Sequence, residues 1–215
     1  MKKALILAGS RGIGKAVTTS LTEIGVETHS FSSSEVDTGN IDHIDELVLT
    51  HPQTDILVLN TGGPPAMDFF DIEPSMWDKY HNQLFMGFVR LLQNIEIKDG
   101  GYVFLISSFN IKEPNPSLIL SNCYRMAFVS VFKSLSKVFA KRKISFINIA
   151  PGPIDTDRLA GFGVNIKELG ESLPMGYVAK PKEIGDFVAA LVEKEINYLS
   201  GVSINFDGAA GNYVL

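Results

Sequence analysis

Short apolar runs alternate with longer amphipathic segments along almost the whole chain. The runs are rich in Ile, Val, Leu and Phe and show little apolar–polar alternation, which is typical of parallel strands covered on both faces. They predict strands at 3–8, 27–31, 55–60, 102–107, 144–150 and 202–207. The segments between them show helical spacing and predict helices at 12–24, 41–50, 74–93, 119–141 and 181–194.

This alternation of strands and helices predicts an α/β fold, a doubly wound parallel sheet (Rossmann fold) with right-handed crossovers. No linker, repeat or low-complexity tract interrupts the 215 residues, so we expect a single domain. Ligands of such folds bind beyond the carboxyl ends of the strands, and residues with useful chemistry are expected there.

The composition excludes several classes of protein. A net charge of −5 argues against a general nucleic-acid binder. The single cysteine, Cys123, leaves no internal disulfide, and the four histidines lack metal-ligand spacing, so no metal is expected. The apolar run before Gly9 is too short for a signal peptide, and no run approaches the ~20 residues of a membrane span. We expect a soluble, cytoplasmic protein without nucleic-acid or membrane partners.

The first predicted strand runs into the glycine-rich segment AGSRGIGKAV (8–17). Such a turn between a strand and a helix lets a pyrophosphate approach the helix N-terminus, and Arg11 can reach a phosphate. The pattern is also compatible with a simple glycine-rich turn, but its position favours nucleotide binding. The predicted binding residues are Gly9, Ser10, Arg11, Gly12, Ile13 and Gly14.

Three further segments follow in the chain: LNTGGPP (59–65), IAPGPIDTD (149–157), and PKEIGDFVAALV (181–192) with YLSGVSINFDGAAG (198–211). With the glycine-rich segment, they make the chain resemble the short-chain dehydrogenase/reductase family over nearly its whole length. The resemblance implies a nicotinamide dinucleotide cofactor whose carboxamide is held by Ile154 and Thr156. The implied cofactor contacts are Asn60, Gly62, Pro151, Gly152, Ile154 and Thr156.

Two features near the adenosine side depart from the common family pattern. The family's Thr–Gly pair falls on Leu7 and Ala8, and we expect Gly9 to supply the flexibility one place later. The second predicted strand ends in SFSSSEVD (30–37), without the acidic residue that would accept from a ribose 2′-hydroxyl. Neutral donors such as Ser32 and Ser33, together with Arg11, favour NADP(H) over NAD(H), although a polar loop with a solvated arginine is the plain alternative.

The resemblance also assigns the end of that segment and the catalytic positions. Asp37 matches the residue that caps the adenine amino group in the family. Ser108 matches the family serine, but the usual thirteen-residue step from it reaches Ser121 instead of tyrosine. Four residues further stands Arg125 in place of lysine, and counting back from Pro151 gives the same position. The chain thus resembles a divergent subgroup without the Tyr-x-x-x-Lys pair, whose members are often labelled 3-oxoacyl-carrier-protein reductases.

The two replacements change the available chemistry. A serine hydroxyl is a far weaker acid than a phenol, whose pKa is about 10, so Ser121 can bind a carbonyl but is a poor proton donor. Arg125 can hold the nicotinamide ribose and supply a fixed positive charge. Two other residues are candidate proton donors: Tyr124, which is otherwise a core or interface tyrosine, and Lys112, which is otherwise a solvated loop lysine.

These residues predict an NADP(H)-dependent oxidoreductase that reduces a small carbonyl compound or oxidises the matching alcohol. The alternatives are a dinucleotide-binding sensor or partner subunit without turnover and, least favoured, a non-redox lyase or epimerase. Segment 157–178 is expected to cover the substrate. By the same resemblance, a homodimer or homotetramer is expected to form through helices 74–93 and 119–141.

Overall fold

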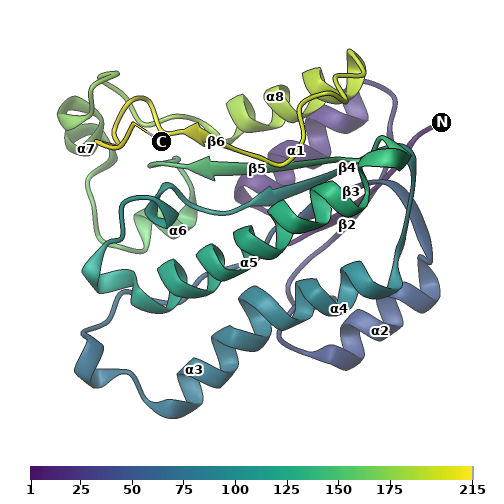
Figure 1. Ribbon diagram of the computed structural model, residues 1–215. Coiled ribbons are helices and arrows are strands. Elements are labelled where there is room, and N and C mark those ends of the chain that lie inside the picture. Colours follow the sequence, from purple (N-terminus) through teal and green to yellow (C-terminus); the bar gives the residue numbers. More distant parts are fainter. Residues whose placement is uncertain (215) are drawn as a thin grey trace.

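A six-stranded, wholly parallel sheet with helices on both faces forms the centre of the computed structural model, which describes residues 1–214 (Figure 1). The strand order is β2-β1-β3-β4-β5-β6, so the chain reverses its winding between β1 and β3, and the predicted doubly wound α/β fold is confirmed. The strands are β1 (Lys3–Leu7), β2 (Glu27–Phe31), β3 (Gln53–Leu59), β4 (Glu96–Ile106), β5 (Ser145–Pro151) and β6 (Val202–Phe206).

Two apolar layers sandwich this sheet. On one face α1 and α8 pack against Ile6, Val58 and Ile149, and on the other α2, α4 and α5 pack against Leu5, Leu57 and Phe146 (Figure 1). Both faces of each central strand are therefore buried, which explains the unbroken apolar runs. Among residues 1–214 no helix has the length and apolar character needed to cross a membrane. The helices are α1 (Gly12–Glu23), α2 (Ile41–Thr50), α3 (Pro74–His81), α4 (Gly87–Asn94), α5 (Ile119–Val138), α6 (Asp157–Ala160), α7 (Ile166–Ser172) and α8 (Pro181–Glu193).

The helix predicted over 74–93 is divided in two. A π-helical turn, Asn82–Met86, separates α3 from α4. Here the helix passes so close to the 37–39 loop that a Cβ on Gly87 would lie 1.8 Å from the Thr38 carbonyl oxygen. The Thr38 hydroxyl also donates to the Gln83 carbonyl (2.9 Å), which the wider turn leaves accessible. Periodicity alone could not reveal this contact.

Strand β4 begins earlier than the expected residue 102. Its first part pairs with the start of β3, and the register shifts between Thr54 and Ile56. Gly100 lies in the left-handed region (φ +75°), and a Cβ on Gly101 would lie 2.4 Å from the Asp55 carbonyl oxygen. These two glycines allow the irregularity, and they also interrupt the apolar run that marked the strand in the sequence.

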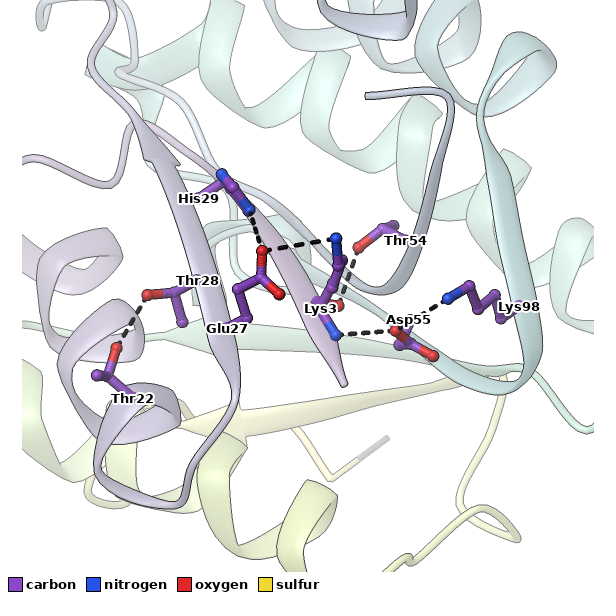
Figure 2. Close-up of polar contacts among 8 residues, drawn as sticks. All are labelled: Lys3, Thr22, Glu27, Thr28, His29, Thr54, Asp55 and Lys98. Atoms are coloured by element: carbon purple, nitrogen blue, oxygen red, sulfur yellow. Dashed lines mark hydrogen bonds and ion pairs between the residues drawn. The ribbon is translucent and has the colours of Figure 1, made fainter. Parts of the chain in front are cut away.

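Polar side chains bind the amino ends of the strands together (Figure 2). The Thr54 hydroxyl lies 3.0 Å from the Lys3 carbonyl oxygen, and the Lys3 amide donates to Asp55 Oδ2 at 2.8 Å. Asp55 is also paired with Lys98 at 3.7 Å, and Glu27 with Lys3 at 3.5 Å. The polar groups at this end of the sheet thus bind to other residues of the same chain.

Candidate functional site

Two adjoining cavities open at the carboxyl ends of the strands, where the fold predicts a ligand. The larger, of about 780 Å³, is lined by the glycine-rich loop, by Ser33 and by residues 60–66. The smaller, of about 200 Å³, is lined by Ser108, Ser121 and Arg125. Both cavities share the lining residues Ile13, Asn60, Thr61, Thr156, Arg158 and Phe162.

The glycine-rich loop leads directly into the first turn of α1. Gly12 has φ +55°, and a Cβ there would lie 3.4 Å from the Thr156 side chain. A Cβ on Gly14 would lie 2.2 Å from the Ala8 carbonyl oxygen, and Asn60 Nδ2 donates to the same oxygen at 3.3 Å. No acidic residue stands in the first turn of α1, so its amide groups and dipole remain open to an anion. This cradle fits a pyrophosphate.

Ala8, not Gly9, takes the unusual backbone conformation of this loop. Ala8 has φ +47°, a left-handed conformation that costs a non-glycine residue roughly 1 kcal/mol. The expectation that Gly9 supplies the flexibility is wrong, because no positive φ occurs there. Gly9 is needed for space: a Cβ on it would lie 2.6 Å from Ser30 Cβ on β2.

The loop after β2 holds an acidic residue that the sequence reasoning did not use. Glu35 accepts hydrogen bonds from the Ser32 amide and hydroxyl, both at 2.7 Å, and these bonds lower the pKa of the Glu35 carboxyl. Both hydrogen-bond donors of Ser32 are therefore used within the loop, whereas Ser33 and Arg11 line the larger cavity. Asp37 is exposed, and its Oδ1 accepts from the Gly39 amide at 2.9 Å.

The segment after β5 forms the opposite wall. Gly152 packs closely on the chain beyond β6, where a Cβ on it would lie 2.8 Å from Asp207 Cα. Ile154 pairs with Ala179 in a parallel bridge, and Asp155 forms an ion pair with Lys180. Because residues 154–155 and 179–180 are joined, both ends of segment 157–178, with α6 and α7, are anchored beside the cavities.

Ser121 and Arg125 form a buried pair one turn apart on α5. Arg125 Nε donates to Ser121 Oγ at 3.1 Å, and its Nη1 donates to the Ile106 carbonyl oxygen at the end of β4, at 3.0 Å. Their residues are only 6% and 9% exposed. Burial, and secondly the positive charge of Arg158, lower the pKa of Arg125 to about 10, so it is charged at neutral pH. Ser121 Oγ accepts this bond, and its own hydrogen can be donated to a ligand in the smaller cavity, which Ser121 lines.

Ser108 also lines the smaller cavity and carries a similar hydroxyl. It begins a single 3₁₀ turn, Phe109–Ile111, and its Oγ accepts from the Asn110 amide at 3.2 Å. The two serines therefore have the same arrangement: one bond accepted from the protein and one hydrogen left to donate. Together they can polarise an oxygen atom placed between them.

The structure does not bring the two candidate proton donors to the cavities. The Lys112 ammonium lies 5.2 Å from the centre of the Tyr213 ring, over the C-terminal segment. Tyr124 packs edge-on against Trp77 at 6.1 Å and beside His81 at 5.5 Å, and burial raises the pKa of its phenol. Neither residue lines either cavity. Helix direction explains the second case, since Tyr124 points about 100° away from Arg125.

Arg158 and Gln83 are among the cavity-lining residues that sequence reasoning missed. Gln83 Nε2 lies 3.2 Å from both Thr61 Oγ1 and the Gly62 carbonyl oxygen, and so supports the loop after β3. Arg158 follows Thr156 by two residues, and a cation so close to the carboxamide segment was the available signal. Within residues 1–214 no group of His, Cys, Asp and Glu side chains is arranged to hold a metal ion.

Known proteins resemble this chain in sequence and in fold. The family model described as enoyl-(acyl carrier protein) reductase matches residues 36–209. An oxidoreductase of Bacillus subtilis is 24% identical over 96% of this chain and 95% of its own length. A cyclic-di-GMP-binding biofilm dispersal mediator protein of Escherichia coli is 24% identical over 98% of this chain and 97% of that protein. A short chain dehydrogenase of Burkholderia cenocepacia, solved with NADP, has a TM-score of 0.87 at 21% identity, covering 97% of each chain.

Proposed function

Because the chain belongs to the short-chain dehydrogenase/reductase family, we propose that it is an NADP(H)-dependent oxidoreductase with an altered proton-transfer site. It reduces a small carbonyl compound, or oxidises the matching alcohol, by hydride transfer. The observation that carries this proposal is the Ser121–Arg125 pair, a hydroxyl and a buried cation facing the smaller cavity where the family places tyrosine and lysine.

The residues that would hold the cofactor line the two adjoining cavities. The start of α1 and Arg11 would bind its phosphates, and Ser33 lies beside the expected adenosine 2′-phosphate. Thr156 and the Ile154 backbone would bind the carboxamide. The Burkholderia neighbour solved with NADP supports the same choice of cofactor. When bound, the nicotinamide supplies or accepts the hydride.

The protein's own contribution is electrostatic. During reduction, negative charge develops on the substrate oxygen, and the hydroxyls of Ser108 and Ser121 donate hydrogen bonds to it. Arg125 stabilises the same charge through Ser121 and through its field in a largely buried site. Neither group is an efficient acid at neutral pH, so we infer that Ser121 passes on a proton taken from water in the cavity. Lys112 and Tyr124 do not line the cavities, so this scheme gives them no part in proton transfer.

Turnover with purified protein tests the proposal. NADPH oxidation is followed by absorbance with a panel of small aldehydes, ketones and 3-oxo esters. We expect Ser121→Ala and Ser108→Ala each to lower kcat/KM about ten- to hundredfold, while Lys112→Ala and Tyr124→Phe change it less than threefold. A large loss of kcat/KM in Lys112→Ala or in Tyr124→Phe would identify the substituted residue as the proton donor.

A second candidate is a dinucleotide-binding protein without turnover. Two observations favour it: the exchanged tyrosine and lysine positions, and the similarity to an Escherichia coli protein named for binding cyclic-di-GMP. Calorimetry separates the two functions. Tight NADPH binding with no turnover on any carbonyl compound of the panel would support a sensor, and binding of cyclic-di-GMP in place of NADPH would reassign the larger cavity.

A further inference from the structure

The five arginines of the chain fall into two groups. Arg90 is paired with Asp45 at 2.7 Å and Arg142 with Asp99 at 2.6 Å. Arg11, Arg125 and Arg158 have no carboxylate partner within residues 1–214, and all three line the joined cavities. Within residues 1–214, the arginines without a carboxylate partner thus gather where a ligand would bind.

Arg158 lines both cavities and is held by the loop after β3. Its Nη1 donates to the Gly63 carbonyl oxygen at 3.0 Å and its Nη2 to the Pro64 carbonyl oxygen at 2.9 Å. Its guanidinium lies 5.2 Å from the centre of the Phe162 ring. These contacts fix the guanidinium although the residue as a whole is exposed.

Arg158 and Arg125 converge on one point. A Cβ on Gly63 would lie 2.8 Å from Arg158 Nη2 and 3.4 Å from Arg125 Nη2. Burial, and secondly the nearby charge of Arg158, lower the pKa of Arg125. Asp157 is the acidic residue in the lining, but it forms no ion pair with either arginine within residues 1–214. Two adjacent cations at a cavity favour a bound anion.

We propose that Arg125 and Arg158 bind an anionic oxygen group of the substrate, so that the substrate is a short oxo acid or the matching hydroxy acid. This inference rests on the proposed oxidoreductase function and names its substrate class. Both arginines line the smaller cavity with Ser108 and Ser121, whose other walls include the apolar Leu118, Leu159 and Phe162. A short carbon chain carrying a carbonyl and a carboxylate matches this combination.

The cofactor's diphosphate is the other possible source of the anion, because Arg158 also lines the larger cavity. However, the first turn of α1 and Arg11 already offer that diphosphate a site. We therefore assign Arg158 to the substrate and design the test so that the two sources give different results.

The binding test uses malonate as an unreactive carboxylate probe. Its affinity is measured by calorimetry with and without saturating NADP⁺, for the wild type, Arg158→Gln, Arg158→Lys and the paired-arginine control Arg142→Gln. We expect Arg158→Gln to weaken malonate binding at least tenfold, Arg158→Lys to weaken it less, and Arg142→Gln to leave it unchanged. NADP⁺ affinity should change less than threefold in all variants.

The activity test compares acetoacetate with its methyl ester, which differ by one negative charge. The wild type should prefer the acid in kcat/KM, and Arg158→Gln should lower that preference at least tenfold through KM. Absence of malonate binding to the wild type, or an unchanged preference in Arg158→Gln, would overturn the proposal. A tenfold loss of NADP⁺ affinity in Arg158→Gln with malonate binding intact would assign the arginine to the cofactor.

Failure of the proposed function gives a different pattern. If the wild type binds no NADP⁺, the oxidoreductase assignment falls, while malonate binding without cofactor still reports on the arginine pair. Malonate binding that disappears in Arg158→Gln would then keep the anion site, and binding that persists there would refute it.

Discussion

The two ends of the sheet differ in how their charged side chains are paired. At the amino ends, Asp55 accepts from the Lys3 amide and pairs with Lys98, and Glu27 pairs with the Lys3 ammonium (Figure 2). At the carboxyl ends, Arg125 is buried with only a hydroxyl and a carbonyl as partners, and Arg158 is held by two carbonyl oxygens. At the amino ends the charged side chains pair with one another, whereas at the carboxyl ends the two arginines have no carboxylate partner within residues 1–214.

The difference separates residues that stabilise the fold from residues that await a ligand. The paired groups at the amino ends stabilise the folded protein without any ligand. An unpaired cation at a cavity destabilises the free protein and contributes only when an anion arrives, which is the trade between stability and activity common at functional sites. Substitutions at the two ends should therefore affect different measurements.

The largest effect is expected from removing the buried cation. Arg125→Met should lower kcat/KM about a hundredfold, because the developing negative charge on the substrate oxygen loses its stabilising field. Steady-state kinetics with NADPH and a carbonyl substrate from the panel provide the measurement. Arg125→Lys, which keeps the charge but shortens the reach, should retain more activity than Arg125→Met, and equal losses would argue for a packing role.

The second effect compares two glycines with similar backbone conformations at opposite ends of the molecule. Gly12 has φ +55° beside Thr156, whereas Gly100 has φ +75° with open space around it. Gly12→Ala and Gly100→Ala should each lose roughly 1–2 kcal/mol of stability. Only Gly12→Ala should weaken NADPH binding, by about tenfold, because its Cβ enters the cradle. Calorimetry and thermal unfolding of both variants test this, and equal NADPH affinities would contradict it.

A third change addresses the amino ends alone. The Thr54 hydroxyl is fully buried and lies 3.0 Å from the Lys3 carbonyl oxygen and 2.9 Å from that of Ile56. Thr54→Val keeps the shape but leaves these carbonyl groups without the hydroxyl donor, at a cost of about 1 kcal/mol. Tm should fall by roughly 2–4 °C while NADPH affinity stays the same. Weaker NADPH binding in this variant would show that the two ends are coupled.

The smallest effect concerns the strained alanine of the glycine-rich loop. Ala8→Gly relieves a left-handed conformation, and the greater flexibility of the unfolded chain offsets part of the gain. We expect stability to rise by less than about 1 kcal/mol, measured by urea unfolding. A loss of stability would mean that the Ala8 methyl group makes contacts worth more than the strain.

The sequence by itself predicted the fold and the edge of the sheet at which the candidate site lies. Apolar runs without alternation identified strands buried on both faces, and glycine and proline segments at their carboxyl ends identified the ligand edge. Counting from Ser108 and from Pro151 reached Arg125, and the structure places its side chain at the smaller cavity. These features depend on local spacing, which the sequence carries directly.

Only the tertiary structure decided which side chains face one another. Lys112 and Tyr124 are close to the site residues in sequence. In the structure Lys112 lies over the Tyr213 ring, and Tyr124 lies on another face of α5, where it packs against Trp77. Arg158 and Gln83 reach the cavities because segments far apart in the chain meet there. The physical reason is that contact, burial and charge repulsion are properties of pairs, and a single chain position does not contain its partner.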